Sequence, residues 1–335
     1  MEQPVTPMPR LRPMSIGDML DAAFRLYRKH FLTFIGIAAL LQVPMTILQL
    51  LLQFQIGGQA LQNWLRFATR PPRILPGQNI LDIFPLGDIV TFVGISLALG
   101  AVQFLLVRNL ITGALANAVA RSYRGQPVSI LGSYNLGLRR FLALVGASLA
   151  TFVIGVLFLA LIFGCTFGSM FVLLSNMGSR NAASGVLTSL LIVFLILGLF
   201  AFVLVVMLYF YARLLVTTQA IVLEDQGPLG GIARSWRLVG GAFWRTLAIA
   251  VLMYILAYLI AGIPSMITSF ALSILSGNAL DTLVRNQIIV AVVAQIGQIV
   301  VLPLQLVIFT LLYYDLRIRK EGYDLELMAQ QATTS

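Results

Sequence analysis

Six long apolar runs constrain this chain more than any other feature of its sequence. They are Phe31–Leu52, Ile89–Val107, Phe141–Phe163, Val186–Leu208, Phe243–Ile260 with a continuation past Pro264, and Ile288–Tyr314. A helical run of about 20 apolar residues crosses the hydrocarbon core of a bilayer, which is roughly 30 Å thick. Only a helix satisfies the backbone hydrogen bonds of a single span there. The runs therefore predict an all-α integral membrane protein with six transmembrane helices.

The composition supports the same conclusion. Of the 335 residues, 59% are hydrophobic and only 10% are charged, whereas a soluble domain has about 25% charged residues. The net charge of +10 is typical of proteins that bind nucleic acid, but the basic residues lie mostly at the ends of the apolar runs and form no separate basic domain. We therefore expect no nucleic acid as a partner. We expect membrane lipids, anionic ones included.

The distribution of basic residues predicts the orientation of the chain. Five of the 22 lysines and arginines fall in the segments after the first, third and fifth runs. The other 17 fall at the two ends of the chain, in the segments after the second and fourth runs or, for Arg245, at the start of the fifth run. The five are Arg66, Arg70, Arg73, Arg180 and Arg285. Because lysine and arginine accumulate on the cytoplasmic side, we expect a multi-pass protein of the cell membrane with both termini in the cytoplasm.

Amphipathic stretches before the first, third and fifth runs suggest a threefold repeat. In the first stretch, after a predicted N-cap formed by Ser15 and Asp18, apolar residues recur at helical spacing: Ile16, Met19, Leu20, Ala23, Phe24, Tyr27 and Phe31. Similar stretches begin near Ile130 and Leu229, and Phe24-Arg25-Leu26 matches Trp236-Arg237-Leu238. The alternative is that any amphipathic segment before a span has this pattern, since short matches are weak evidence.

On the repeat interpretation, the chain is a single polytopic membrane domain over residues 1–335. It is divided into units at approximately 13–125, 126–226 and 227–327, with a short polar tail at 328–335. Each unit is an amphipathic interfacial helix followed by a transmembrane hairpin. Helical spacing continues past the second run, and apolar residues continue past the fourth, so we also expect additional helices on the cytoplasmic side.

Three arginines end the even-numbered runs at corresponding positions: Arg108, Arg213 and Arg317. Together they would form a ring near the inner membrane surface, where guanidinium groups bind phosphate in a forked geometry. The alternative is that each arginine is a topology anchor whose side chain reaches the interface independently. We carry the three as candidate contacts to anionic lipid or phosphate.

Glutamines form a second group of candidates. Gln295, Gln298 and Gln305 lie on one face of the sixth run, Gln103 lies in the second, and Gln42 and Gln49 lie in the first. Amides within a bilayer need hydrogen-bond partners, so we expect them to face the helix bundle. Their roles are either a polar pathway or hydrogen bonds between helices. The absence of an ionisable residue beside them at mid-membrane depth favours hydrogen bonds between helices.

Catalytic groups are scarce in this sequence. It contains one histidine, His30, and one cysteine, Cys165. It has no P-loop, no nucleophile elbow and no zinc-binding motif. We therefore expect no metal, no cofactor and no enzymatic activity.

Three segments resemble a known family. They are Arg12–Tyr27, which includes the first amphipathic stretch, Gly227–Arg245, and Tyr313–Glu326. Together they are similar to bacterial and archaeal proteins akin to the membrane domain of glycerophosphoryl diester phosphodiesterase. In that enzyme, catalysis belongs to a separate soluble barrel with histidine, carboxylates and a metal. Nothing in this chain corresponds to the barrel, so the resemblance implies a stand-alone membrane module and not a hydrolase.

These observations favour a non-enzymatic membrane module that binds or organises lipid, or a membrane-protein partner of an envelope pathway, at the cytoplasmic face. The alternative is a transporter or a flippase-like carrier of a small or lipid-like substrate. A membrane-embedded enzyme is the third possibility, and the missing catalytic groups argue against it.

Overall fold

The computed structural model describes residues 14–59, 63, 66–67, 86–176, 182–275 and 280–322. The predicted polar tail at 328–335 and three of the outer arginines, Arg70, Arg73 and Arg180, lie outside these residues. The described residues form helices and contain no strand. Six of the helical stretches are long and apolar enough to cross a membrane. The prediction of an all-α protein with six spans is therefore confirmed.

The spans contain several helical elements each. The first comprises α2 (Phe31–Leu52) and the π-helical η1 (Gln53–Gly57), and the second comprises α5 (Leu86–Val102), η2 (Gln103–Val107) and α6 (Arg108–Tyr123). The third and fourth are α8 (Phe141–Asn176) and α9 (Ala182–Leu214), followed by the short α10 (Thr217–Leu223). The fifth comprises α12 (Phe243–Ala257), η3 (Tyr258–Gly262) and α13 (Ile263–Leu275), and the sixth is α14 (Leu280–Glu321).

A short helix directly precedes the first, third and fifth spans. These helices are α1 (Ile16–Lys29), α7 (Ile130–Arg139) and α11 (Pro228–Val239). Ser15 and Asp18 form the predicted cap of α1, each side chain bonding to the other residue's backbone N–H. Only one edge of the predicted apolar face of α1 is buried, since Met19 is 1% exposed whereas Phe24 is 40% exposed.

Tyrosines attach two of the short helices to spans. The Tyr27 hydroxyl of α1 donates to the Val300 carbonyl of α14 at 2.8 Å. The Tyr134 hydroxyl of α7 donates to the Ile37 carbonyl of α2 at 2.6 Å. These bonds fix the short helices at one end of the bundle, because each connects to backbone in a different long helix.

The core lies around α14, which contacts α1, α2, α6, α12 and α13. Leu311 and Tyr313 are fully buried there. Two backbones come close at Gly297 of α14, where an added Cβ would come within 2.6 Å of the Ala261 Cα in η3. The π turn η3 ends two residues before Pro264, which cannot donate a backbone hydrogen bond.

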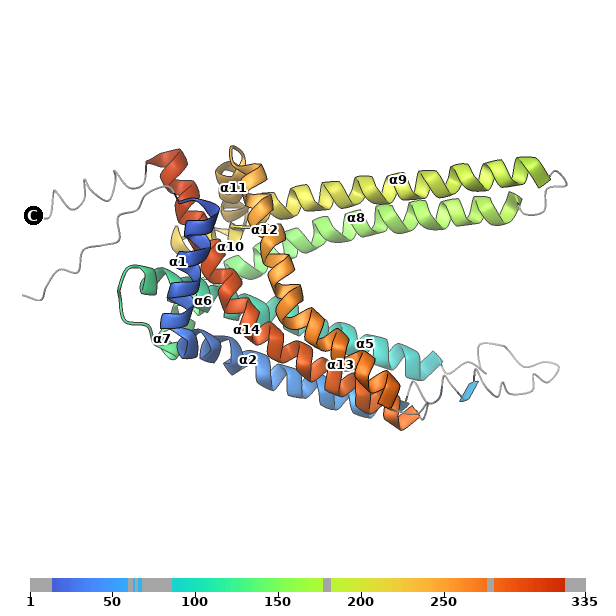
Figure 1. Cartoon of the computed structure of the whole chain (residues 1–335), viewed down its shortest axis with the longest axis horizontal. Coiled ribbons are helices and arrows are strands. Elements are labelled where there is room, and N and C mark those ends of the chain that lie inside the picture. The colour runs from blue at the N-terminus through green and yellow to red at the C-terminus, as the bar shows by residue number, and fades with distance from the viewer. Residues whose placement is uncertain are drawn as a thin grey trace, which may run out of the picture.

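The long helices do not form one uniform bundle (Figure 1). All of them converge at the end occupied by α1, α7, α10 and α11, at the left of the view. Toward the right, α8 and α9 remain in contact with each other and diverge from α2, α5, α13 and α14. Both helices of this pair expose large apolar side chains along their length, among them Leu157 and Phe194. Such surfaces are suited to contact with hydrocarbon.

Candidate functional site

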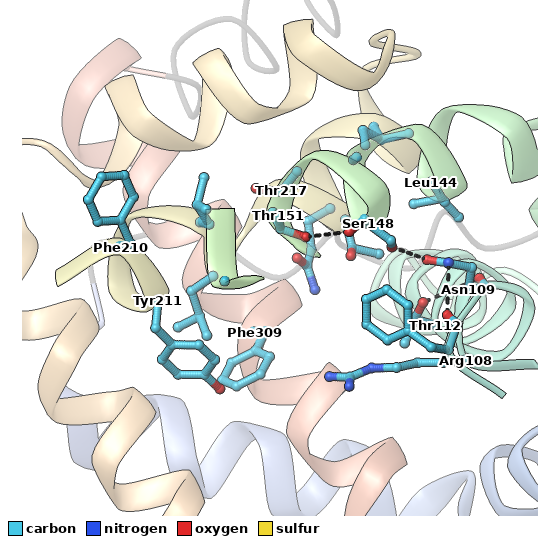
Figure 2. Close-up of a pocket in the computed structure, with 18 of the residues that line it drawn as sticks. Arg108, Asn109, Thr112, Leu144, Ser148, Thr151, Phe210, Tyr211, Thr217 and Phe309 are labelled. Carbon is cyan, nitrogen blue, oxygen red and sulfur yellow. Dashed lines mark hydrogen bonds between the residues drawn. The ribbon is translucent and has the colours of Figure 1, made fainter. Parts of the chain in front are cut away.

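A cavity of about 370 Å³ lies near the convergent end, between α6, α8, α9, α10 and α14. Its walls are largely apolar and include Phe104, Phe158 and Leu302. Polar side chains from four helices also line it (Figure 2), among them Arg108, Asn109, Ser148, Thr151, Tyr211 and Thr217. A mostly apolar cavity with a few convergent polar groups is typical of a small-molecule site.

The π turn η2 positions the first of these polar residues. At its end, the Arg108 N–H bonds to the Gln103 carbonyl, five residues back. The α-helical acceptor would be the Phe104 carbonyl. That carbonyl instead accepts from Asn109 Nδ2 at 3.2 Å. Because π turns are frequent at functional sites, this local irregularity is a signal that a search by hydropathy alone does not detect.

A chain of hydrogen bonds connects α6 to α8 across the cavity wall. The Ser148 hydroxyl donates to Asn109 Oδ1 at 2.7 Å, and the Thr151 hydroxyl donates to the Ser148 carbonyl at 2.9 Å. Figure 2 shows both bonds as dashed lines. The hydroxyl protons of Ser148 and Thr151 are therefore already used within the protein, and their oxygens retain capacity to accept.

Arg108 supplies the positive charge of the cavity. Its side chain extends toward Tyr211 and Phe309 (Figure 2), and the described residues that line the cavity include no aspartate or glutamate. Arg108 is exposed and makes no salt bridge with a described residue. A guanidinium group at the edge of an apolar cavity is suited to bind an anion.

The other two predicted arginines have protein partners instead. Arg213 lies over the rings of Tyr209 and Trp236, with centroid distances of 5.1 and 4.9 Å, and donates to the Trp236 carbonyl at 3.1 Å. Arg317 lies 3.3 Å from carboxylate oxygens of both Glu224 and Glu321. The three arginines therefore differ in environment, and only Arg108 lines the cavity. A shared phosphate ring stays a prediction.

Arg317 belongs to an ion network at the convergent end. Arg234 of α11 donates to both carboxylate oxygens of Glu224, at 2.7 and 2.8 Å. It also pairs with Glu321, and the Tyr313 hydroxyl donates to Glu224. Burial alone would raise the pKa of Glu224, but the hydrogen bonds from Arg234 and Tyr313 and the charges of Arg234 and Arg317 hold that pKa below its usual 4.5. Glu224 is therefore a carboxylate at neutral pH.

Three of the glutamines form the expected hydrogen bonds between helices. Gln42 Nε2 of α2 donates to Gln295 Oε1 of α14 at 3.1 Å, and Gln103 Nε2 of η2 donates to Gln42 Oε1 at 3.0 Å. This chain joins three spans. The preference for interhelical hydrogen bonds is confirmed for Gln42, Gln103 and Gln295.

Gln298 and Gln305, the other two glutamines predicted to lie on one face of α14, were also expected to face the helix bundle, and this expectation is only partly met. Gln305 lines the cavity, but Gln298 is exposed, so the prediction that it faces the helix bundle is wrong. The reason lies in the divergence of the helices. Spacings of four, seven and eleven residues place Gln298 on the face of α14 that carries Leu302, Gln305 and Phe309, and at Gln298 the described residues leave this face exposed.

Sequence reasoning did not identify most of the polar cavity residues. Asn109, Ser148, Thr151, Tyr211 and Thr217 come from four helices, and none belongs to a recognisable motif. Among the described residues, no group of three or more His, Cys, Asp or Glu could hold a metal ion. The one usable signal was the presence of polar residues inside segments otherwise apolar enough to span a membrane.

Comparison with known families gives one match. Residues 14–316 match the model of a domain of unknown function, DUF7847. The chain belongs to this family. The matched region includes all of the cavity residues named above. No curated protein and no solved structure matches the chain. Because the family description states no function, the resemblance to the phosphodiesterase membrane domain stays a prediction.

Proposed function

We propose that this protein binds an anionic lipid in the cavity between α6, α8, α9, α10 and α14, with Arg108 as the main contact to the anionic group. The observation that carries the proposal is the placement of Arg108 in a largely apolar cavity whose lining, in the described part of the chain, contains no carboxylate. A cation near the hydrocarbon region is costly unless an anion compensates it. An anionic lipid supplies that anion, and its hydrocarbon suits the apolar walls.

The proposal includes the orientation expected from the charge distribution. The convergent end of the helices faces the cytoplasm, α1, α7 and α11 lie at the membrane interface, and the spans form three hairpins. The protein lies in the cell membrane with both termini inside. The cavity then opens at the depth of the inner leaflet, where anionic head groups produce a negative surface potential. Binding involves no catalytic step.

The test compares single arginine variants. Arg108→Gln should weaken the binding of phosphatidylglycerol about tenfold, because a charge-assisted hydrogen bond contributes about 1.5–3 kcal/mol. Arg108→Lys should restore only part of the binding, since lysine lacks the forked donor geometry. Arg121→Gln is the matched control, because it removes a charge from the same helix at a position that does not line the cavity. Native mass spectrometry measures the bound lipid.

The outcomes separate the proposal from its alternatives. Equal losses in Arg108→Gln and Arg121→Gln would reduce the effect to surface charge and overturn the proposed site. Losses of similar size in Arg213→Gln and Arg317→Gln, without loss of thermal stability, would support the predicted ring instead. We expect those two variants to lower stability, since both arginines bond to protein groups.

A lipid carrier is the second candidate function. It is favoured by Gln298 and Gln305, which share the face of α14 that leads from the cavity along the diverging helices. Head groups that move through a bilayer need polar partners along their route. Reconstituted protein would then accelerate the exchange of labelled lipid between leaflets, and Gln298→Leu would slow it. Exchange at the rate of protein-free vesicles would leave binding as the function.

A further inference from the structure

The α10 wall of the cavity contains buried polar atoms without partners. Gln219 is 1% exposed and Thr217 is 7% exposed, and both line the cavity. Gln219 Oε1 and Thr217 Oγ1 have no hydrogen-bond partner among the residues that the structure describes. An unsatisfied buried polar atom costs free energy comparable to a lost hydrogen bond. Two such atoms at one wall of a cavity therefore indicate that something else bonds to them.

The balance of donors and acceptors indicates what that partner carries. The hydroxyl protons of Ser148 and Thr151 already bond to protein oxygens. Gln219 Oε1 can only accept. Gln219 Nε2 and the Thr217 hydroxyl can also donate, so this side of the cavity suits a group that both donates and accepts, whereas Arg108 offers only donors. A complementary ligand has an anionic group at Arg108 and hydrogen-bond donors near Gln219 and Thr217.

The absence of a carboxylate from the lining decides between the two common kinds of donor. Hydroxyl and ammonium groups both donate, but a buried ammonium group needs a negative partner. The described cavity residues supply no negative partner, and the phosphate of the ligand itself is already assigned to Arg108. A neutral hydroxyl satisfies Gln219 Oε1 without introducing a second charge.

We infer that the lipid bound in this cavity has a polyol phosphodiester head group, with its phosphate at Arg108 and its hydroxyls at Gln219 and Thr217. This inference rests on the proposed function and adds the class of head group to it. The head group is recognised by α6 and α10 together, which brings the spans before and after α8 into one site.

The test compares three lipids with identical acyl chains. Phosphatidylglycerol carries hydroxyls on a singly charged phosphodiester, phosphatidylethanol has the same charge without hydroxyls, and phosphatidylethanolamine has an ammonium group. The purified full-length protein should bind phosphatidylglycerol at least about fivefold more tightly than phosphatidylethanol, as one hydrogen bond to a buried acceptor predicts. Phosphatidylethanolamine should bind more weakly still. Native mass spectrometry with competing lipids gives the ratios.

Two near-isosteric variants assign the selectivity to α10. Gln219→Met and Thr217→Val should each reduce the preference for phosphatidylglycerol over phosphatidylethanol and leave phosphatidylethanol binding unchanged. Arg108→Gln should weaken both lipids equally. Neither α10 variant should lower the thermal stability of the lipid-free protein, because each removes an unsatisfied polar atom. A stable variant that keeps the full preference would overturn the inference.

The failures of the two proposals are distinguishable. Equal binding of phosphatidylglycerol and phosphatidylethanol, lost in Arg108→Gln, would overturn the inference and leave anionic-lipid binding intact. Tighter binding of phosphatidylethanolamine would overturn the hydroxyl assignment. Binding of all three lipids regardless of Arg108 would overturn the proposed function itself. Glycerophosphoglycerol, which has the same phosphodiester and hydroxyls without acyl chains, should not displace the lipid at equal concentration, and displacement would overturn a lipid as the source of the head group.

Discussion

The backbone N–H of Met14 donates a hydrogen bond to Asp315 Oδ1 at 2.9 Å, across 301 residues of sequence. The carboxylate of Asp315 is fully buried and also pairs with Arg245 at 3.1 Å and Arg319 at 3.0 Å. Both arginines donate in turn to the Met14 carbonyl. The two ends of the DUF7847 match, residues 14 and 316, are thus held together by one buried carboxylate.

Asp315→Asn should destabilise the protein by about 3 kcal/mol, because removing one partner of a buried ion pair leaves uncompensated charge. The expected observation is a lower midpoint of thermal unfolding in detergent, with faster proteolysis ahead of α1. Asp225→Asn is the matched control. Asp225 also pairs with an arginine, Arg140, but its side chain is 71% exposed, so its loss should change stability by less than about 1 kcal/mol. Equal effects of the two substitutions would contradict a special role of the buried Asp315 carboxylate in holding the two ends of the matched region together.

Glu224 makes the stability of the convergent end depend on pH. Its pKa is lower in the folded protein than the usual 4.5, so the unfolded chain binds the proton more readily than the folded one. The stabilisation is therefore fully present above about pH 4.5 and is lost as the pH falls through the lowered pKa. Glu224→Gln should lower the unfolding midpoint clearly at neutral pH and progressively less below about pH 4.5. A constant difference across this range would show that the charge of Glu224 is not responsible.

The spans were predictable because hydropathy is a local property of the chain, and the cap at Ser15 was predictable because its partner Asp18 is three residues away. The cavity was not predictable. It is formed by residues of α6, α8, α9, α10 and α14, which are far apart in the sequence and come together only through packing. The role of Asn109 depends on the π turn before it, and a single extra residue in a helical turn leaves no trace in an apolar run.

The three predicted arginines illustrate the same limit. Their equivalent positions in the sequence suggested one shared role, yet Arg213 is held by aromatic rings and Arg317 by carboxylates. Tyr209 and Glu321 are four residues from their arginines in the same helices, but Trp236 and Glu224 are 23 and 93 residues away along the chain, so a pattern within one span cannot reveal those two. Gln298 and Gln295 likewise share a predicted face, but only Gln295 meets a partner from another helix.

The glutamine chain should stabilise the packing of three spans. Gln42→Leu removes both of its hydrogen bonds, to Gln103 and Gln295, and leaves two amides without that partner. Interhelical hydrogen bonds in membranes contribute about 0.6 kcal/mol each on average, so we expect a loss of about 1–2 kcal/mol in unfolding free energy. Gln298→Leu makes the same chemical change on the same bundle at an exposed position and should have little effect on stability. A larger loss from Gln298→Leu would indicate that an unrecognised partner covers that face.

The orientation of the protein can be tested by cysteine labelling in intact cells. Cys165 is first replaced by alanine, which leaves a chain without thiols. Single cysteines are then placed at Gly77, in a segment expected outside, and at Gln126 and Gly227, in segments expected inside. Gln126 is preferable to its neighbour Gly125, whose φ of 72° disfavours a side chain. Because 17 of the 22 basic residues lie on the predicted inner side, a membrane-impermeant maleimide should label Gly77→Cys alone, and the other two only after the cells are opened. Labelling of Gln126→Cys and Gly227→Cys in intact cells would reverse the orientation and move the Arg108 cavity to the outer leaflet.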